Sequence, residues 1–214
     1  MKIADYFNNK FHLDLYQNEE RYIDFLDIFN LLNGKGKKAL DIGCSSGGFS
    51  SKLSKLGYDV IGIDIADKSV ERAKKNFLAI SFYNADILEW QTKEKFDYIF
   101  GMFDLLSFIM KKKLRIKALS IMYDLLKDNG KIYLTFMKPT WKTYIRSVLY
   151  KITHPAREFL DAEQKHFKTK EALSKHNTIK KEIIEYCKEL NISTNIIEKD
   201  KIFIAIIKKE NKKK

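Results

Sequence analysis

Three aspartates that follow or close short apolar stretches have the spacing of a binding site for a polar small molecule. Asp41 lies in ALDIG, Asp64 ends VIGID, and Asp86 follows a third apolar stretch. A carboxylate about 20 residues after a glycine-rich turn accepts hydrogen bonds from ribose hydroxyls in dinucleotide folds. We therefore expect Asp64 to bind ribose hydroxyls, Asp86 an exocyclic amine and Asp41 an ammonium group. The alternative for each acid is a helix cap or a turn residue.

The segment ALDIGCSSGGFS (39–50) supplies the turn that such a site requires. Gly43 permits a sharp turn, and Gly47 and Gly48 let the next helix begin close to a ligand. Ser45 stands where dinucleotide sites of the pattern G-x-G-x-x-G have their central glycine, which argues against NAD or FAD. The N–H groups at the start of the helix can bind a carboxylate. Together with the three acids, the segment predicts a pocket for an adenosine that carries an amino acid.

Alternating strands and helices place these residues at one edge of a sheet. Five strand–helix units and a final hairpin indicate an α/β fold. We expect a doubly wound, Rossmann-like, seven-stranded and mostly parallel sheet with an antiparallel last strand, and ligands at the C-terminal ends of its strands. The expected strands are 37–43, 58–63, 80–83, 96–101, 131–136, 194–198 and 202–207. The expected helices are 13–32, 49–56, 68–77, 111–127 and 178–190, with a turn at 128–130.

The domain organisation follows from the same pattern. Residues 37–208 are expected to form one domain, preceded by an N-terminal helical lid segment (1–36) and followed by a basic tail (209–214). Within the domain, the polar and mixed stretch 140–177 predicts a helical insertion on the side of the pocket where a second substrate, the acceptor, would bind. The lid segment and the insertion are expected to cover the ligand, with Tyr16 among the covering residues.

Composition excludes several classes of protein. The chain has 214 residues, of which 45% are hydrophobic, only two cysteines and a net charge of +12. These values exclude a disordered chain and a disulfide framework. Apolar runs are too short to span a bilayer, and the N-terminus has no apolar signal core, so we expect a cytoplasmic protein that does not enter a membrane. Because 35 of the 40 basic residues are lysines, the charge is weak evidence for nucleic-acid binding.

The ordered motifs resemble the class I S-adenosylmethionine-dependent methyltransferases, of the small-molecule, non-processive type. They are ALDIGCSSGG (39–48), VIGID (60–64), SVERAKKN (69–76), NADI (84–87), FDYIFGMFDLLSFI (96–109) and LLKDNGKIYLTF (125–136). The resemblance implies S-adenosylmethionine as cofactor, with a cradle at 43–47, ribose contact at Asp64, adenine contacts at Ile65, Asp86 and Ile87, and methionine-end contacts near Met102 and Phe103. Ser45 departs from the glycine usual in this family. The full set expected to bind the cofactor is Tyr16, Asp41, Gly43, Cys44, Ser45, Gly47, Asp64, Ile65, Asp86, Ile87, Met102 and Phe103.

The acceptor is expected to be a small molecule that is methylated at oxygen or nitrogen. No N/D-P-P-Y/F motif or Pro-Cys pair follows the fourth strand, which disfavours the two kinds of DNA-base methylation. Asp104 is expected either to act as a base or orienting group, or to cap the next helix. His166 is expected either to accept the proton near neutral pH or to lie on the surface. The five positive charges of KKKLRIK (111–117) favour an anionic acceptor, and the histidines lack metal-ligand spacing.

Two alternatives remain open. GCSSGGFS and the lysine of MKP (137–139) resemble ribose 2′-O RNA methyltransferases, and 111–117 would attract phosphates. Against this alternative, Met102 stands where those enzymes place an acid, and the strand 202–207 contains none. The second alternative is a partner subunit that binds the cofactor without catalysis.

Overall fold

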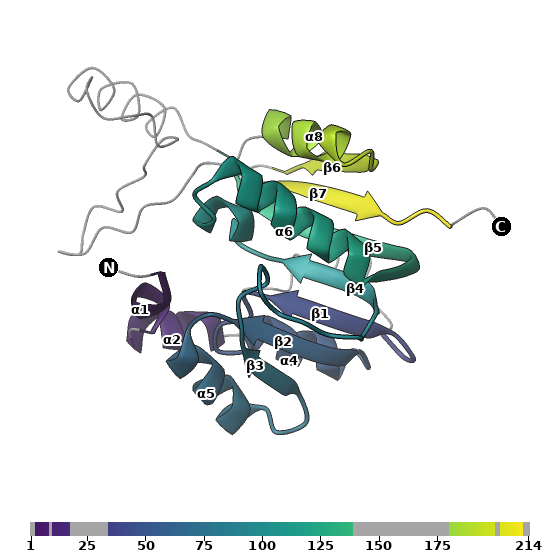
Figure 1. The fold of residues 1–214 in the computed structure, drawn as a ribbon. Coiled ribbons are helices and arrows are strands. Elements are labelled where there is room, and N and C mark those ends of the chain that lie inside the picture. The colour runs from purple at the N-terminus through teal and green to yellow at the C-terminus, as the bar shows by residue number, and fades with distance from the viewer. Residues whose placement is uncertain (1–2, 9, 18–33, 139–179, 200–201, 212–214) are drawn as a thin grey trace, which may run out of the picture.

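A computed structural model describes residues 3–8, 10–17, 34–138, 180–199 and 202–211. The chain forms one seven-stranded sheet with the order β3-β2-β1-β4-β5-β7-β6 (Figure 1). Strand β7 is antiparallel to both of its neighbours, and all other pairs are parallel, which confirms the predicted α/β fold. The strands are β1 (Lys38–Ile42), β2 (Asp59–Asp64), β3 (Ser81–Asn84), β4 (Phe96–Gly101), β5 (Leu126–Met137), β6 (Thr194–Glu198) and β7 (Ile202–Lys208).

Helices lie on both faces of the sheet. Residues of α6 and α8 join the core on one face, and residues of α4 and α5 join those on the other (Figure 1). Two short helices, α1 and η2, were not expected from the sequence, and the predicted helix 13–32 is described only to residue 17. The predicted insertion 140–177, with His166, lies outside the described residues. The helices are α1 (Ile3–Phe7), α2 (Lys10–Gln17), α4 (Gly48–Lys55), α5 (Asp67–Asn76), η2 (Leu105–Phe108), α6 (Lys112–Leu125) and α8 (Lys180–Glu189).

Apolar residues alternate between the two faces along the central strands. In β5, Ile132 and Leu134 pack under α6, whereas Tyr133 between them joins the opposite core. In β4, Ile99 and Phe100 likewise face opposite sides. Because both faces of a parallel sheet are covered, such strands are apolar throughout, and this is the reason they could be located from the sequence. None of the helices in the described part of the chain is long and apolar enough to cross a membrane.

Strand β5 begins five residues earlier than the sequence indicated. The segment 128–130, expected to be a turn, is part of the strand. The pairing of β5 with β4 shifts register at this segment. Asn129 has φ 62°, a conformation that asparagine tolerates. Its N–H donates to the carbonyl of Lys209 (3.1 Å), and the N–H of Lys209 donates to the carbonyl of Gly130 (2.9 Å). These partners come from the predicted basic tail, a long-range pairing that local patterns do not reveal.

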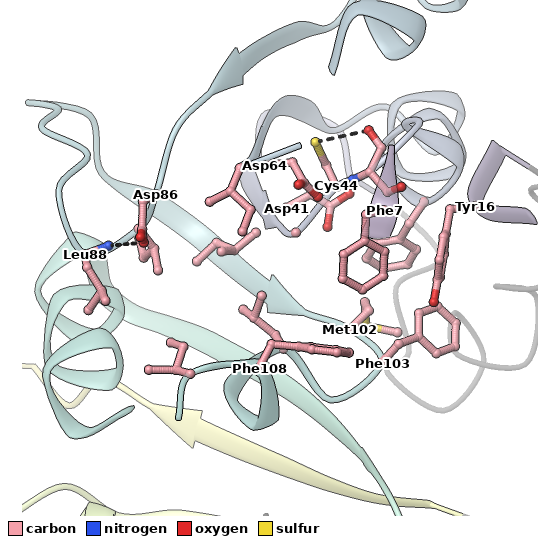
Figure 2. A pocket seen from close by; sticks show the side chains of 18 of the residues that line it. Phe7, Tyr16, Asp41, Cys44, Asp64, Asp86, Leu88, Met102, Phe103 and Phe108 are labelled. Carbon is pink, nitrogen blue, oxygen red and sulfur yellow. Dashed lines mark hydrogen bonds between the residues drawn. The ribbon is translucent and has the colours of Figure 1, made fainter. Parts of the chain in front are cut away.

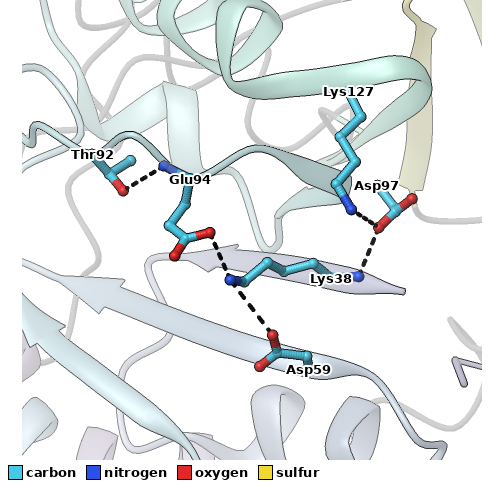
Figure 3. A network of polar contacts seen from close by, with 6 residues as sticks. All are labelled: Lys38, Asp59, Thr92, Glu94, Asp97 and Lys127. Carbon is cyan, nitrogen blue, oxygen red and sulfur yellow. Dashed lines mark hydrogen bonds and ion pairs between the residues drawn. The ribbon is translucent and has the colours of Figure 1, made fainter. Parts of the chain in front are cut away.

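A polar network joins four strands at the N-terminal edge of the sheet (Figure 3). A carboxylate oxygen of Asp97 accepts hydrogen bonds from the Lys38 backbone N–H and from Lys127 Nζ, both at 2.8 Å. Lys38 Nζ lies 2.7 Å from Glu94 and 3.6 Å from Asp59. Asp97 is the central acceptor of this network.

Replacing Asp97 with alanine is expected to lower stability by about 1–2 kcal/mol, because a half-buried backbone N–H and an ammonium lose their acceptor. Burial acts to raise the pKa of Asp97, but the hydrogen bonds from Lys127 and Lys38 outweigh it and lower that pKa. A lowered pKa adds stability above the unfolded value of about 4, and this is lost as pH falls through the folded pKa. Urea unfolding at pH 7 and pH 3 measures both effects. Exposed Glu94→Ala is the control, with an expected change within about 0.5 kcal/mol.

Candidate functional site

A cavity of about 360 Å³ opens at the C-terminal ends of β1, β2 and β4 (Figure 2). It brings together every residue expected to bind the cofactor except Gly47. Figure 2 shows Asp86 at one end of the cavity and Tyr16 at the other, with Asp41 and Asp64 between them. The sequence did not predict the remaining lining residues, which are mostly apolar: Phe7, Ile42, Phe49, Leu88, Leu105, Phe108, Ile109, Met110 and Leu114.

Asp64 ends β2 and is held from two sides. One carboxylate oxygen accepts the N–H of Ser45 and the other accepts the N–H of Ala66, both at 2.8 Å. Burial raises the pKa of Asp64, and these backbone hydrogen bonds act against the rise. Each carboxylate oxygen can accept more than one hydrogen bond. Asp64 thus fixes the glycine-rich loop and can still accept hydrogen bonds from the hydroxyl groups of a ligand.

Asp41 is buried in β1 and has one short polar contact. Its carboxylate accepts a hydrogen bond from Ser50 Oγ at 2.6 Å. Burial raises its pKa to about 7, against the effect of that hydrogen bond, and the nearby charge of Asp64 adds to the rise. A carboxyl group with such a pKa changes charge near neutrality, and a cationic ligand would favour its ionised form.

Asp86 both lines the cavity and shapes a turn. Its Oδ1 accepts the N–H of Leu88 at 2.9 Å, and its carbonyl accepts the N–H groups of Glu89 and Trp90. The turn-residue interpretation is therefore correct for Asp86. Because the side chain is exposed and lines the cavity, it can also accept a hydrogen bond from a ligand.

The glycine-rich loop has two buried hydroxyls without a hydrogen-bond partner among the described residues, those of Ser45 and Ser46. Ser45 lines the cavity and has φ 46°, and Gly43, two residues before it, has φ 75°. A buried hydroxyl without a partner costs free energy, and a polar ligand group in the cavity would supply one for Ser45. The loop therefore fits a ligand with a carboxylate or hydroxyl at this position.

Gly47 does not line the cavity. It has φ 86°, and a Cβ at this position would lie 2.9 Å from both Phe77 and Phe82. The expectation that Gly47 contacts the cofactor is not supported by this placement. The glycine is needed because the loop passes close to Phe77 at the end of α5 and to Phe82 in β3.

Gly47→Ala is accordingly expected to lower stability by about 1–3 kcal/mol through positive φ and steric overlap. Ser46→Ala is the matched control, because it removes a hydroxyl that has no hydrogen-bond partner among the described residues, and it is expected to be neutral or slightly stabilising. Thermal unfolding of both variants measures the difference. Equal Tm values for Gly47→Ala and the unsubstituted protein would show that residue 47 does not require glycine.

Cys44 is a packing residue. It is buried with Val70, Ala73 and Phe82, and burial, with the charge of Asp64 adding to it, raises the pKa of its thiol well above the ordinary value. A thiol that stays protonated is a poor nucleophile. Its place in the cavity wall is consistent with contact to a ligand but not with attack on one.

Aromatic side chains from the N-terminal segment form one wall of the cavity with residues that follow β4. Phe7 packs edge-to-face on Phe108 with 5.2 Å between ring centroids. The ring centroids of Tyr16 and Phe103 are 6.0 Å apart. Arg72 on α5 holds this segment, with its guanidinium 2.6 Å from Asp14 and 2.8 Å from Gln17. The apolar run 105–110 was a sequence signal for this wall, but its partner Phe7 could not be identified from local patterns.

Two residues expected near the reaction centre have structural contacts elsewhere. Asp104 does not line the cavity and its side chain does not cap η2; its Oδ1 accepts the N–H of Met137 at 2.8 Å, which ties the end of β4 to β5. Lys138, the lysine of the RNA alternative, lies 3.4 Å from Glu198 on β6. Within the described part of the chain, no cluster of three or more His, Cys, Asp or Glu could hold a metal ion.

Comparison with known proteins agrees with this geometry. The family described as "Methyltransferase domain" matches residues 39–130. Ubiquinone biosynthesis O-methyltransferase of Pelagibacter ubique is 34% identical over 54% of this chain and 48% of that protein. The protein of the same name from Bartonella tribocorum is 30% identical over 74% of this chain and 69% of that protein. The chain belongs to the class I S-adenosylmethionine-dependent methyltransferases.

Solved structures of such methyltransferases share the fold. A methyltransferase from Methanosarcina mazei has a TM-score of 0.72 at 21% identity, over 87% of this chain and 98% of that one. Magnesium protoporphyrin IX methyltransferase from Synechocystis, with bound S-adenosylhomocysteine, has a TM-score of 0.63 at 19% identity, over 97% and 98%. At these identities the likeness concerns the fold alone. The chain spans about half the length of the first curated relatives it matches.

Proposed function

We propose that this methyltransferase transfers a methyl group from S-adenosylmethionine to an oxygen or nitrogen of a small molecule with an apolar body. The observation that carries the proposal is a single cavity whose strand-end acids adjoin an aromatic and aliphatic wall. Curated relatives are named as O-methyltransferases of ubiquinone biosynthesis, which supports an acceptor of this kind. Apolar cavities with a few placed polar groups are typical small-molecule sites.

The described residues suit the parts of the cofactor in a definite order. Asp86, Ile87 and Ile65 would hold the adenine, and Asp64 the ribose. Asp41 and the loop with Ser45 would hold the amino-acid end, with Met102, Phe103 and Tyr16 next to the sulfonium. When bound, S-adenosylmethionine supplies an activated methyl group on a positively charged sulfur. These assignments follow the family resemblance. The lining of the cavity supports them, and so does the Ser45 hydroxyl, which has no hydrogen-bond partner among the described residues.

The chain would contribute to catalysis by aligning the acceptor atom with the methyl group and by excluding water from the cavity. Alignment alone can supply up to about 7–11 kcal/mol when the reacting atoms are held in place. Among the described residues that line the cavity there is no histidine, lysine or glutamate. We therefore retain His166, which lies outside the described residues, as the candidate proton acceptor, and we do not assign that role to Asp104.

The test is calorimetric titration with S-adenosylhomocysteine, followed by transfer of radiolabelled methyl from S-adenosylmethionine. Probes are 4-tert-butylcatechol (apolar), 3,4-dihydroxybenzoate (anionic) and an RNA transcript. Transfer to a catechol supports the proposal, and preference for the benzoate would support an anionic acceptor. Transfer to RNA alone would replace the proposal by the RNA alternative. Binding without transfer to any acceptor in a wider screen would favour a non-catalytic partner subunit.

The proposed place of action is the cytoplasm. Cys44 and Cys187 are free and buried thiols. Free thiols are compatible with a reducing compartment, where disulfides are rare. Cell fractionation with an antibody against the chain would test this assignment.

A further inference from the structure

Arg115 has a buried position that its sequence context did not indicate. It belongs to the basic stretch 111–117, which was expected to attract anions at the pocket rim, yet its side chain is only 1% exposed. Its Nη1 donates to the carbonyl oxygen of Ile109 at 2.9 Å and to that of Met110 at 2.7 Å. The guanidinium therefore binds protein backbone and is not available to a phosphate.

Helix α8 supports the same guanidinium from the other side. Arg115 Nε donates to Tyr186 Oη at 2.9 Å, and Tyr186 Oη donates onward to Glu182 Oε1 at 3.4 Å. Glu182 also lies 4.0 Å from Arg115 Nη2, and the guanidinium carbon is 5.8 Å from the centre of the Tyr186 ring. Tyr186 is fully buried, so its hydroxyl needs these partners. The buried positive charge is thus paired and hydrogen-bonded, as burial of a charge requires.

The backbone that Arg115 binds forms the apolar wall of the cavity. Ile109 and Met110 line the cavity, and so does Leu114, which directly precedes the arginine. The segment 109–111 connects η2 to α6. The Ile109 N–H donates to the Leu106 carbonyl at 3.1 Å, and the Lys111 carbonyl accepts the N–H groups of Leu114 and Arg115 at the start of α6. The carbonyls of Ile109 and Met110 between them are bound by the guanidinium. Arg115 is the group that binds the two successive carbonyls of this connection.

We propose that Arg115 is a positioning residue for the acceptor wall of the cavity, supported by Tyr186 and Glu182. The inference rests on the proposed function, because it assigns the wall at 105–114 to the acceptor and the acids to the cofactor. A planar guanidinium can donate to two carbonyls and a hydroxyl at the same time, whereas the ammonium of lysine cannot reproduce that fork. The helix α8, far from the cavity in sequence, thereby contributes to acceptor binding.

The test compares Arg115→Lys and Tyr186→Phe with Ile183→Val, a core change on α8 that removes none of the polar groups. Three quantities are measured: KM for 4-tert-butylcatechol, Kd for sinefungin (a non-reactive cofactor analogue) and amide hydrogen exchange in 105–114. For Arg115→Lys we expect at least a fivefold higher KM, faster exchange, and a sinefungin Kd within twofold of the unsubstituted value. Tyr186→Phe should change the same quantities less. Ile183→Val should lower Tm but leave all three unchanged.

Unchanged exchange in 105–114 for Arg115→Lys would overturn the proposal, and so would an equal loss of sinefungin and catechol affinity. The two proposals fail separately. If the unsubstituted protein methylates no catechol, the proposed acceptor class is wrong. Hydrogen exchange in 105–114 and the Kd for sinefungin still decide whether Arg115 orders this wall without changing cofactor binding.

Discussion

Asp64→Ala is expected to weaken sinefungin binding about 100-fold, equivalent to about 2.7 kcal/mol. The carboxylate is the acceptor proposed for the ribose hydroxyls, and it also binds the N–H groups of Ser45 and Ala66. Removing it leaves the ligand hydroxyls without acceptors and releases the loop that holds the amino-acid end. Both losses act on the cofactor half of the cavity, so the effect should exceed that of any other single acid.

Calorimetric titration of Asp64→Ala, Asp64→Asn and Asp86→Asn with sinefungin separates the contribution of the Asp64 charge from that of its hydrogen bonds and from that of Asp86. Asp64→Asn keeps a carbonyl acceptor but loses the charge, and an intermediate loss is expected. Asp86→Asn changes an exposed acid whose main bond within the protein is to the Leu88 N–H, so a loss of at most about tenfold is expected. Tm values measured alongside show whether each variant is folded. Asp64→Ala that is folded and binds sinefungin normally would refute the assignment of the ribose site.

The affinity for S-adenosylhomocysteine is expected to rise about tenfold between pH 6 and pH 7.5, and Asp41 is the cause. Its pKa in the unliganded protein is raised to about 7, so the carboxyl is largely protonated at pH 6. An ammonium group close to it would favour the carboxylate and lower the pKa. Ligand binding then releases a proton, and affinity increases with pH until Asp41 is already ionised before binding.

Stability without ligand should change with pH in the opposite direction. Because the folded pKa of Asp41 lies above its unfolded value of 3.8, the folded state binds more protons between these two values. Stability therefore falls as pH rises from about 4 through 7, by about 1.4 kcal/mol for each unit of difference. Asp41→Asn should abolish this contribution and flatten the pH dependence of S-adenosylhomocysteine affinity. A persistent pH dependence in this variant would assign the titration to another group.

The apolar runs of the chain were enough to locate the strands, their alternation with helices and the acids near the carboxyl ends of the strands. Buried parallel strands are continuous apolar runs, and the residue after each run lies at the ligand-binding edge by the geometry of the fold. For that reason Asp64 and Asp86 could be placed at one edge without coordinates, and Asp41 could be added because it lies two residues before the Gly43 turn. The family resemblance could be recognised from the same segments.

Which of the neighbouring residues line the cavity depends on contacts between segments that are distant in the chain. Gly47 turned out to face Phe77 and Phe82, and Asp104 binds the Met137 N–H instead of facing the cavity. Arg115, one of seven residues in a basic stretch, is buried against Tyr186, 71 positions away. Phe7 contacts Phe108, 101 positions away. The physical reason is the same in each case: hydrogen bonding and packing between segments distant in the chain set the direction of a side chain, and local sequence patterns carry no information about those partners.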